Sequence, residues 1–151
     1  MKGVTLAPAG AADIPELIDL LGGLFSIEQD FSPDPEKQRR GLVALLASPA
    51  GHVAIARGPD ARAVGMATAQ LVISTAEGAP SAWVEDVVVR EDWRGQGLGR
   101  ALLDAVLDWA RAQGAVRAQL LADLDNAPAL AFYDRVGWQP TRLGAKRFRL
   151  A

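Results

Sequence analysis

The spacing of hydrophobic positions predicts three helices in the first three quarters of the chain. Apolar residues recur three and four positions apart in residues 13–25, 35–47 and 98–113, which is the period of an amphipathic helix. Asp13, with Glu16 three residues later, is the expected cap of the first helix. Asp34 is the expected cap of the second, and Gly114 the stop of the third. A fourth helix follows Asn126 as its cap, with Pro128 in its first turn and Gly137 at its end.

Seven other segments favour strands, because apolar and β-branched residues alternate or run together between turn signals. They are residues 4–9, 51–57, 63–75, 81–89, 116–122, 138–142 and 146–150. Turns at residues 58–60 and 77–80 join the second, third and fourth of these into an antiparallel meander. The order β-α-α-β-β-β-α-β-α-β-β predicts an α+β domain with helices on the faces of a mixed sheet.

Composition narrows the class of protein. A chain of 151 residues, half of them hydrophobic, is enough for one compact domain, residues 1–151. No apolar run approaches the ~18 residues of a membrane span, and the amino terminus lacks a secretory layout, so we expect a cytoplasmic protein. Without cysteine, and with His52 as its one histidine, the chain has no disulfide, no cysteine nucleophile and no expected metal site.

The charges are unevenly distributed. The net charge of −2 argues against nucleic acid as the main partner. Residues 1–89 carry six Lys/Arg and eleven Asp/Glu, and residues 90–151 carry ten and seven, so the two parts hold −5 and +3. An anionic ligand would prefer the second part, although ordinary solvated surfaces explain the difference equally well.

Three glycines at alternate positions, Gly95, Gly97 and Gly99, lie between the strand at 81–89 and the helix at 98–113. The first N–H groups of a helix have no internal partner, so a diphosphate suits this place. The spacing is not that of a Walker loop, and G-x-G-x-x-G would need glycine where Arg100 stands. A tight strand-to-helix connection is the alternative explanation.

Residues 94–99, Arg-Gly-Gln-Gly-Leu-Gly, resemble the R/Q-x-x-G-x-G/A loop of the GNAT superfamily of N-acetyltransferases, which holds the pyrophosphate of acetyl-coenzyme A. Asn126, Ala129, Tyr133 and the pair Gly137-Trp138 are similar to the family's second motif, N-x-x-A-x-x-x-Y-x-x-x-G-F, with tryptophan in place of phenylalanine. The element order agrees as well. The resemblance implies a mixed, mostly antiparallel sheet of about six to seven strands flanked by about four helices.

The resemblance also implies a site for acetyl-coenzyme A. The backbone of Val87, Val88 and Val89 would leave its strand pairing and bind the pantetheine arm. The diphosphate would lie against the amides of Gly95, Gln96, Gly97, Leu98, Gly99 and Arg100. Arg94 or Arg100 would add charge at the rim, unless both are plain surface residues. Asn126 would contact the cofactor as well as cap its helix.

Direct transfer to a primary amine needs positioning and a proton acceptor. The resemblance implies Glu85 for this role, beside Asp86 in a Glu-Asp-x-x-Val stretch. Strict alternation would place the two carboxylates on opposite faces of the strand, and a bulge could exchange them. Tyr133 would protonate the departing thiolate, with core packing as its alternative, and a backbone N–H near Val87 would meet the oxyanion.

The acceptor is expected to be a small cationic amine. Glu28, Asp30 and Phe31 lie in the loop of residues 26–34, which in this family borders the acceptor pocket, and Asp86 would add to its acidity. A polyamine, an amino acid or an aminoglycoside-like compound is favoured over a protein amino terminus or lysine. A non-catalytic acetyl-coenzyme A sensor is the alternative from another class. We expect no membrane partner, and the sequence leaves homodimer formation open.

Overall fold

The structure is a computed structural model that describes residues 1–28 and 30–151. These residues form two compact units, residues 1–120 and residues 121–151. The first unit contains β1 (Thr5–Pro8), a 3-10 turn (Ala11–Asp13), α1 (Ile14–Phe25), α2 (Pro35–Ala47), β2 (Gly51–Arg57), β3 (Ala63–Ser74), β4 (Ala79–Val89), a second 3-10 turn (Glu91–Trp93), α3 (Leu98–Ala112) and β5 (Arg117–Leu120). The second unit contains α4 (Ala127–Arg135).

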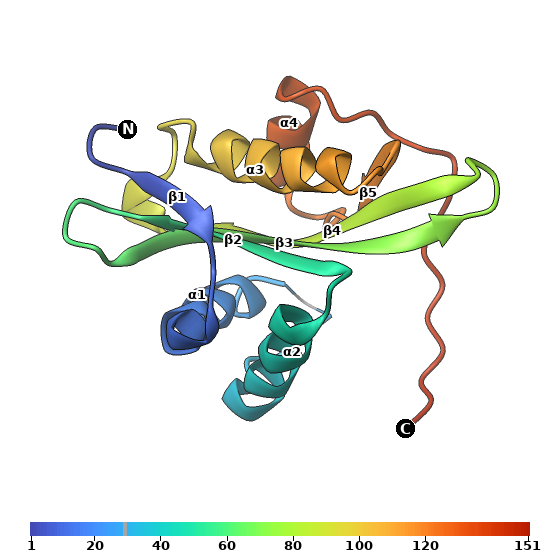
Figure 1. Ribbon diagram of the computed structural model, residues 1–151. Coiled ribbons are helices and arrows are strands. Elements are labelled where there is room, and N and C mark those ends of the chain that lie inside the picture. Colours follow the sequence, from blue (N-terminus) through green and yellow to red (C-terminus); the bar gives the residue numbers. More distant parts are fainter. Residues whose placement is uncertain (29) are drawn as a thin grey trace. The chain divides into compact units, whose positions relative to one another are not determined.

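The first unit is built on one five-stranded sheet in the order β1-β2-β3-β4-β5. The first four strands pair antiparallel, and β5 is parallel to β4. Helices α1 and α2 cover one face of the sheet and α3 covers the other (Figure 1). The α+β fold class expected from the sequence is therefore confirmed.

Both faces of the sheet are packed with apolar side chains. On the α1–α2 face the core contains Ile14, Leu17, Leu20, Leu21, Leu42, Val53, Ile55, Ala63, Met66 and Val88. On the other face α3 buries Leu98, Leu102, Leu103, Val106 and Ala110. The helical spacing of these leucines is the pattern that predicted α1 and α3. No helix in the described residues is both long enough and apolar enough to cross a membrane.

The prediction of strands at residues 138–142 and 146–150 is wrong. The described residues from 138 to 151 contain no strand, and the sheet has five strands in place of the expected six to seven. Alternation of apolar and polar residues favours a strand only where a partner strand pairs with it. Pro140 lacks an N–H, and Lys146, Arg147 and Arg149 give the last segment a run of like charge, so neither segment has much strand preference of its own.

The expected cap of α1 is also wrong. The Asp13 carboxylate makes no cap hydrogen bond to α1; it accepts from the Gly10 amide at 2.8 Å and pairs with the Arg57 guanidinium. Glu16 accepts from the Ala63 amide at 2.7 Å and from Arg57 at 2.9 Å. These carboxylates therefore fasten α1 to the sheet, and the Ala63 hydrogen bond, followed by that of Arg57, lowers the pKa of Glu16.

The other two caps are confirmed. Asp34 accepts from the Lys37 amide at 3.1 Å, and Asn126 accepts from the Ala129 amide at 3.2 Å. Gly114 and Gly137 follow α3 and α4 with φ of 89° and 96°, the left-handed backbone that ends a helix.

Candidate active site

A β-bulge interrupts the pairing of β3 with β4. Thr68 lies opposite Glu85 and Met66 lies opposite Val88, so one residue of β3 faces two residues of β4, Asp86 and Val87. Asp86 has a φ of 51°, a left-handed conformation in which aspartate is one of the few tolerated side chains. The extra residue cancels the alternation, and Glu85 and Asp86 line the same cavity.

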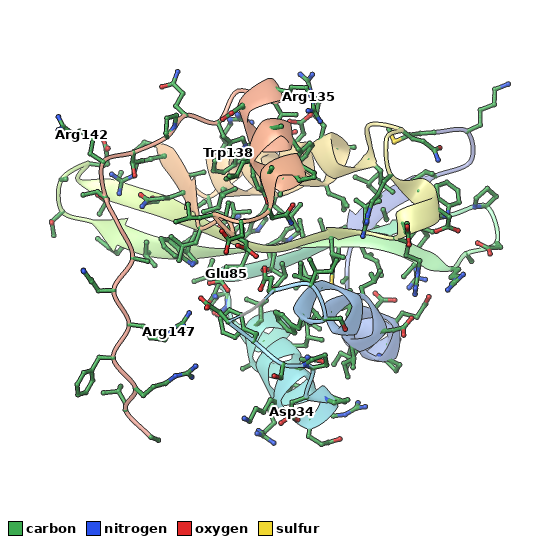
Figure 2. All side chains as sticks on the ribbon, turned by 180° about the vertical axis from the view of Figure 1, so that it is seen from behind. Asp34, Glu85, Arg135, Trp138, Arg142 and Arg147 are labelled. Atoms are coloured by element: carbon green, nitrogen blue, oxygen red, sulfur yellow. The ribbon has the colours of Figure 1, made fainter. Side chains whose placement is uncertain are left out.

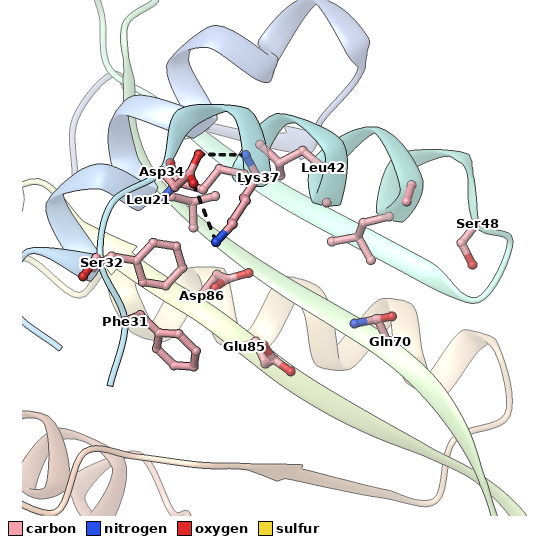
Figure 3. Close-up of a pocket in the computed structure, with 15 residues that line it drawn as sticks. Leu21, Phe31, Ser32, Asp34, Lys37, Leu42, Ser48, Gln70, Glu85 and Asp86 are labelled. Carbon is pink, nitrogen blue, oxygen red and sulfur yellow. Dashed lines mark hydrogen bonds and ion pairs between the residues drawn. The ribbon is translucent and has the colours of Figure 1, made fainter. Parts of the chain in front are cut away.

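This cavity has a volume of about 450 Å³. It lies within the first unit, on the face of the sheet that α1 and α2 cover, and Figure 2 shows Glu85 on that side of the sheet. Its lining includes Leu21, Phe25, Phe31, Leu42 and Leu45 as apolar groups and Ser32, Asp34, Lys37, Gln38, Ser48, Gln70, Glu85 and Asp86 as polar ones. Figure 3 shows this set of residues from α1, the following loop, α2, β3 and β4. A cavity of mixed walls and this size suits a small polar molecule with an apolar skeleton.

The Asp86 carboxylate is half-buried at the floor of the cavity. The buried Thr68 hydroxyl donates to its Oδ2 at 3.0 Å. Burial, together with the negative charges of Glu85 and Glu28, raises the pKa of Asp86 from 3.8 to about 6, against the opposing effect of the hydrogen bond from Thr68. Asp86 is therefore a carboxylate that can take up a proton close to neutral pH.

Glu85 is more exposed than Asp86 and is held in a different way. The indole Nε1 of Trp83 donates to Glu85 Oε1 at 2.6 Å. Trp83 precedes Glu85 by two positions, so both side chains project from the same face of β4. The two neighbouring carboxylates give the cavity a negative floor.

The loop predicted to border the acceptor pocket contributes unevenly. Phe31 lines the cavity and packs against Phe25, with ring centroids 5.7 Å apart and the ring planes tilted by 51°. Glu28 acts on the cavity through its charge, as the pKa of Asp86 shows. Asp30 lies outside the set of described lining residues, and Gln29 lies outside the described part of the chain.

Several lining residues escaped sequence reasoning. Asp34, Gln38, Gly41 and Leu45 all line the cavity from α2 and its cap, and their spacing of three and four positions places them on one face of the helix. A glutamine inside an apolar stripe with Leu42 and Leu45 was the signal available in the sequence. Thr68 was hidden in the same way within an apolar strand.

Strand β5 pairs with only part of β4. Their parallel pairing runs from Ser81–Arg117 to Val84–Leu120 and covers only the first part of β4. Val88 and Val89 keep their partners on β3, whereas Val87 lies in the bulge. The expected loss of pairing for Val88 and Val89 therefore concerns the β5 side alone. The Val89 carbonyl accepts from Arg94 Nε at 3.0 Å.

The glycine loop leads from β4 into α3. Gly95 and Gly97 have φ of 74° and 84°, and a Cβ at either position would meet nothing within 4 Å. Glycine is therefore required here for the backbone conformation, with open space around it. The first loop-to-helix bond runs from the Ala101 amide to the Gly97 carbonyl, so the amides of Leu98, Gly99 and Arg100 precede the helical ladder. This arrangement fits an anionic group.

The two arginines expected at the loop differ in their contacts. Arg94 is held against the Val89 carbonyl, close to the end of β4. Arg100 Nε lies 3.8 Å from Asp104 Oδ2 one helical turn along α3, and both side chains are mostly exposed. Such an exposed pair is worth at most about 1 kcal/mol, so Arg100 keeps most of its freedom to meet an anion.

Asn126 and Tyr133 belong to the second unit, which is described by itself. Asn126 caps α4. The Tyr133 ring lies 5.2 Å from the ring of Phe132 and 6.2 Å from that of Trp138, so it belongs to an aromatic cluster of this unit. Their expected contacts with the cofactor and the leaving thiolate remain predictions.

His52 packs against an aromatic ring of α3. Its ring stacks on Trp109 of α3 at 4.9 Å with 11° between the planes, and burial lowers its pKa. Within the described residues, no group of three or more His, Cys, Asp or Glu is placed to hold a metal.

Comparisons with known proteins agree with this architecture. The family model described as acetyltransferase (GNAT) family matches residues 15–138. Aminoglycoside N(6')-acetyltransferase type 1 of Stenotrophomonas maltophilia is 29% identical over 140 residues, which cover 91% of this chain and 87% of that protein. The enzyme of the same name from Serratia marcescens is 29% identical over 113 residues, covering 73% and 77%.

The fold is also found among solved structures. The aminoglycoside acetyltransferase meta-AAC0020 from an uncultured soil metagenomic sample, in complex with sisomicin, superposes with a TM-score of 0.79 at 22% identity, covering 98% of this chain and 97% of that one. At 22% sequence identity, this structural similarity supports the fold alone. Because the family model spans most of the chain and includes both motifs, this protein belongs to the acetyltransferase (GNAT) family and is an N-acetyltransferase.

Proposed function

We propose that this enzyme transfers the acetyl group of acetyl-coenzyme A to a primary amine of a small cationic molecule that binds in the cavity beside Glu85 and Asp86. The β-bulge of β4 carries this proposal, because it brings two adjacent carboxylates to one cavity. A negative floor favours a cationic amine. The 29% identical aminoglycoside acetyltransferases make an amino sugar compound the first candidate.

The cofactor site fits the same proposal. Acetyl-coenzyme A would supply an acyl group that is already activated as a thioester. The amides from Gly95 to Arg100 would bind its diphosphate, and the β5-facing edge of Val87, Val88 and Val89 would bind the pantetheine arm. Positioning then supplies most of the rate enhancement.

Asp86 is the better proton acceptor of the two carboxylates. It is half-buried, it is oriented by Thr68, and its pKa of about 6 is closer to that of an amine than an ordinary carboxylate's. Glu85, which the sequence resemblance favoured, then provides the second negative charge that holds the cationic acceptor. For the departing thiolate we retain Tyr133 as proton donor on the strength of its motif.

An acceptor panel tests this function. Free-thiol release from acetyl-coenzyme A is measured with sisomicin, glucosamine, spermidine and a lysine-containing peptide. We expect turnover with at least one small amine. Turnover with the peptide alone would refute the acceptor class, and calorimetric binding of acetyl-coenzyme A without turnover of any amine would support the sensor alternative.

A further inference from the structure

One side chain that lines the cavity has a buried polar atom without a hydrogen-bond partner among the described residues. Gln38 lies on the cavity face of α2 and is 9% exposed. Among the described residues, its Oε1 is the one buried side-chain nitrogen or oxygen atom without a hydrogen-bond partner. Buried polar groups are normally paired, so such an atom calls for an explanation.

The neighbouring polar side chains of α2 are engaged elsewhere. Lys37 Nζ lies 3.8 Å from Asp34 Oδ2 in a largely exposed ion pair, and the Asp34 side chain also caps the helix. Figure 3 draws both interactions at the start of α2. Leu42 and Leu45, one and two turns after Gln38, line the same cavity with carbon. The Gln38 carbonyl is therefore an isolated acceptor in an apolar part of the wall.

We propose that Gln38 selects the acceptor molecule, because its Oε1 accepts a hydrogen bond from a second donor group of the amine substrate. This inference rests on the proposed function and adds to it. Glu85 and Asp86 would hold the reacting amine, and Gln38 reads a separate hydroxyl or ammonium group. A donor group of the bound substrate would give this buried oxygen the hydrogen-bond partner that it lacks among the described residues.

The rest of the lining defines the skeleton between these two polar groups. The rings of Phe25 and Phe31 and the side chains of Leu21, Leu42 and Leu45 offer an apolar surface. The acceptor is therefore an amine whose compact carbon skeleton carries at least one further donor, such as an amino sugar or a diamine. A monoamine without a second donor leaves the Gln38 oxygen buried and unpaired, and the site discriminates against it.

Acceptor kinetics with the full-length Q38L variant test this inference. The acceptors are glucosamine, sisomicin and spermidine, which carry further donors, and cyclohexylamine, which offers a similar ring and one amine alone. We expect Q38L to lower kcat/KM for the best donor-bearing acceptor by about 10- to 100-fold, and to change kcat/KM for cyclohexylamine by less than about twofold. The KM for acetyl-coenzyme A should stay the same.

Two further variants separate recognition from folding. Q38E keeps an acceptor atom and should retain the preference for donor-bearing amines. If Q38E lost this preference, Gln38 would act as a hydrogen-bond donor and the proposal would be wrong. Q113L makes the same chemical change at the exposed end of α3 and should leave all acceptors unchanged. Because Q38L removes an unpaired buried atom, its melting temperature should equal or exceed that of the wild type; a lower value would indicate a structural role.

The outcomes separate this inference from the proposed function. If the wild type turns over no amine, the proposed function fails. If it acetylates amines, but Q38L changes every acceptor equally or none of them, the assignment of Gln38 is wrong while the acetyl transfer stands.

Discussion

At the scale of single residues, Asp86 combines an unusual backbone with an unusual environment. Its φ of 51°, its half-buried carboxylate and the hydrogen bond from Thr68 all depend on the same bulge. The surrounding sheet offsets the free-energy cost of backbone strain and desolvation at this residue. Positions with such costs are often functional.

This burial predicts that Asp86 weakens the fold at neutral pH. The pKa of Asp86 is about 6 in the folded protein and has its ordinary value in the unfolded chain. Between these two pKa values the folded state binds more protons than the unfolded state. The free energy of unfolding therefore falls as the pH rises from about 4 to above 6. D86N should therefore raise the free energy of unfolding at pH 8 by about 1–3 kcal/mol, with the difference shrinking towards pH 4.

Urea unfolding of both proteins at the two pH values measures this. A D86N variant that is less stable than the wild type at pH 8 would contradict the assigned environment of Asp86.

The residue scale also shows where sequence reasoning stops. Glu85 and Asp86 were recognisable from their motif. That both side chains line one cavity depends on a β-bulge in β4, which no local sequence pattern predicts. Gln38 and Thr68 are polar residues within apolar stretches, and only their neighbours in space distinguish them from ordinary core positions.

At the scale of elements, the glycine loop between β4 and α3 makes a prediction with a close control. Gly97 and Gly78 both have positive φ, 84° and 65°, and both have open space where a Cβ would stand. Alanine should therefore cost about 1–2 kcal/mol of stability at either position through backbone strain. Only G97A should weaken the binding of acetyl-coenzyme A, by about tenfold or more, because it changes the orientation of the backbone amides that are proposed to bind the diphosphate.

Isothermal titration calorimetry with acetyl-coenzyme A compares the two variants. Equal affinities for G97A and G78A would show that the loop is merely a connection.

Elements were predictable where a period of apolar residues coincided with a clear start or stop. Helix α2 has the predicted bounds, and α3 ends one residue early, before Gly114. The errors concern relations between distant segments: the strands expected after residue 137 lack partners, and the Asp13 carboxylate binds Arg57 of β2 in place of α1. A local pattern cannot specify either partner.

At the scale of the whole molecule, the chain consists of two units, and the predicted site residues divide between them. The cavity, the bulge and the glycine loop lie in residues 1–120, whereas Asn126 and Tyr133 lie in residues 121–151. That these units act as one domain, as the sequence suggests, remains a prediction.

Cofactor binding should stabilise the whole molecule. At a concentration of 100 times its Kd, acetyl-coenzyme A should add about 2.7 kcal/mol, which for a chain of this size raises the melting temperature by about 5–10 °C. Pantetheine lacks the diphosphate and should give a much smaller shift at the same concentration. Equal shifts in a thermal denaturation experiment would exclude the glycine loop as the main cofactor contact.

The pH dependence of kcat/KM for the best acceptor tests the central claim most directly, because the claim is that Asp86 takes the amine proton at the bulge. Asp86 must be deprotonated to accept a proton, so activity should rise with pH through an apparent pKa near 6. E85Q, which removes a neighbouring charge, should move this rise to lower pH. D86N should lose the rise together with about 10²- to 10⁴-fold in kcat/KM; a D86N enzyme that keeps both would contradict the account.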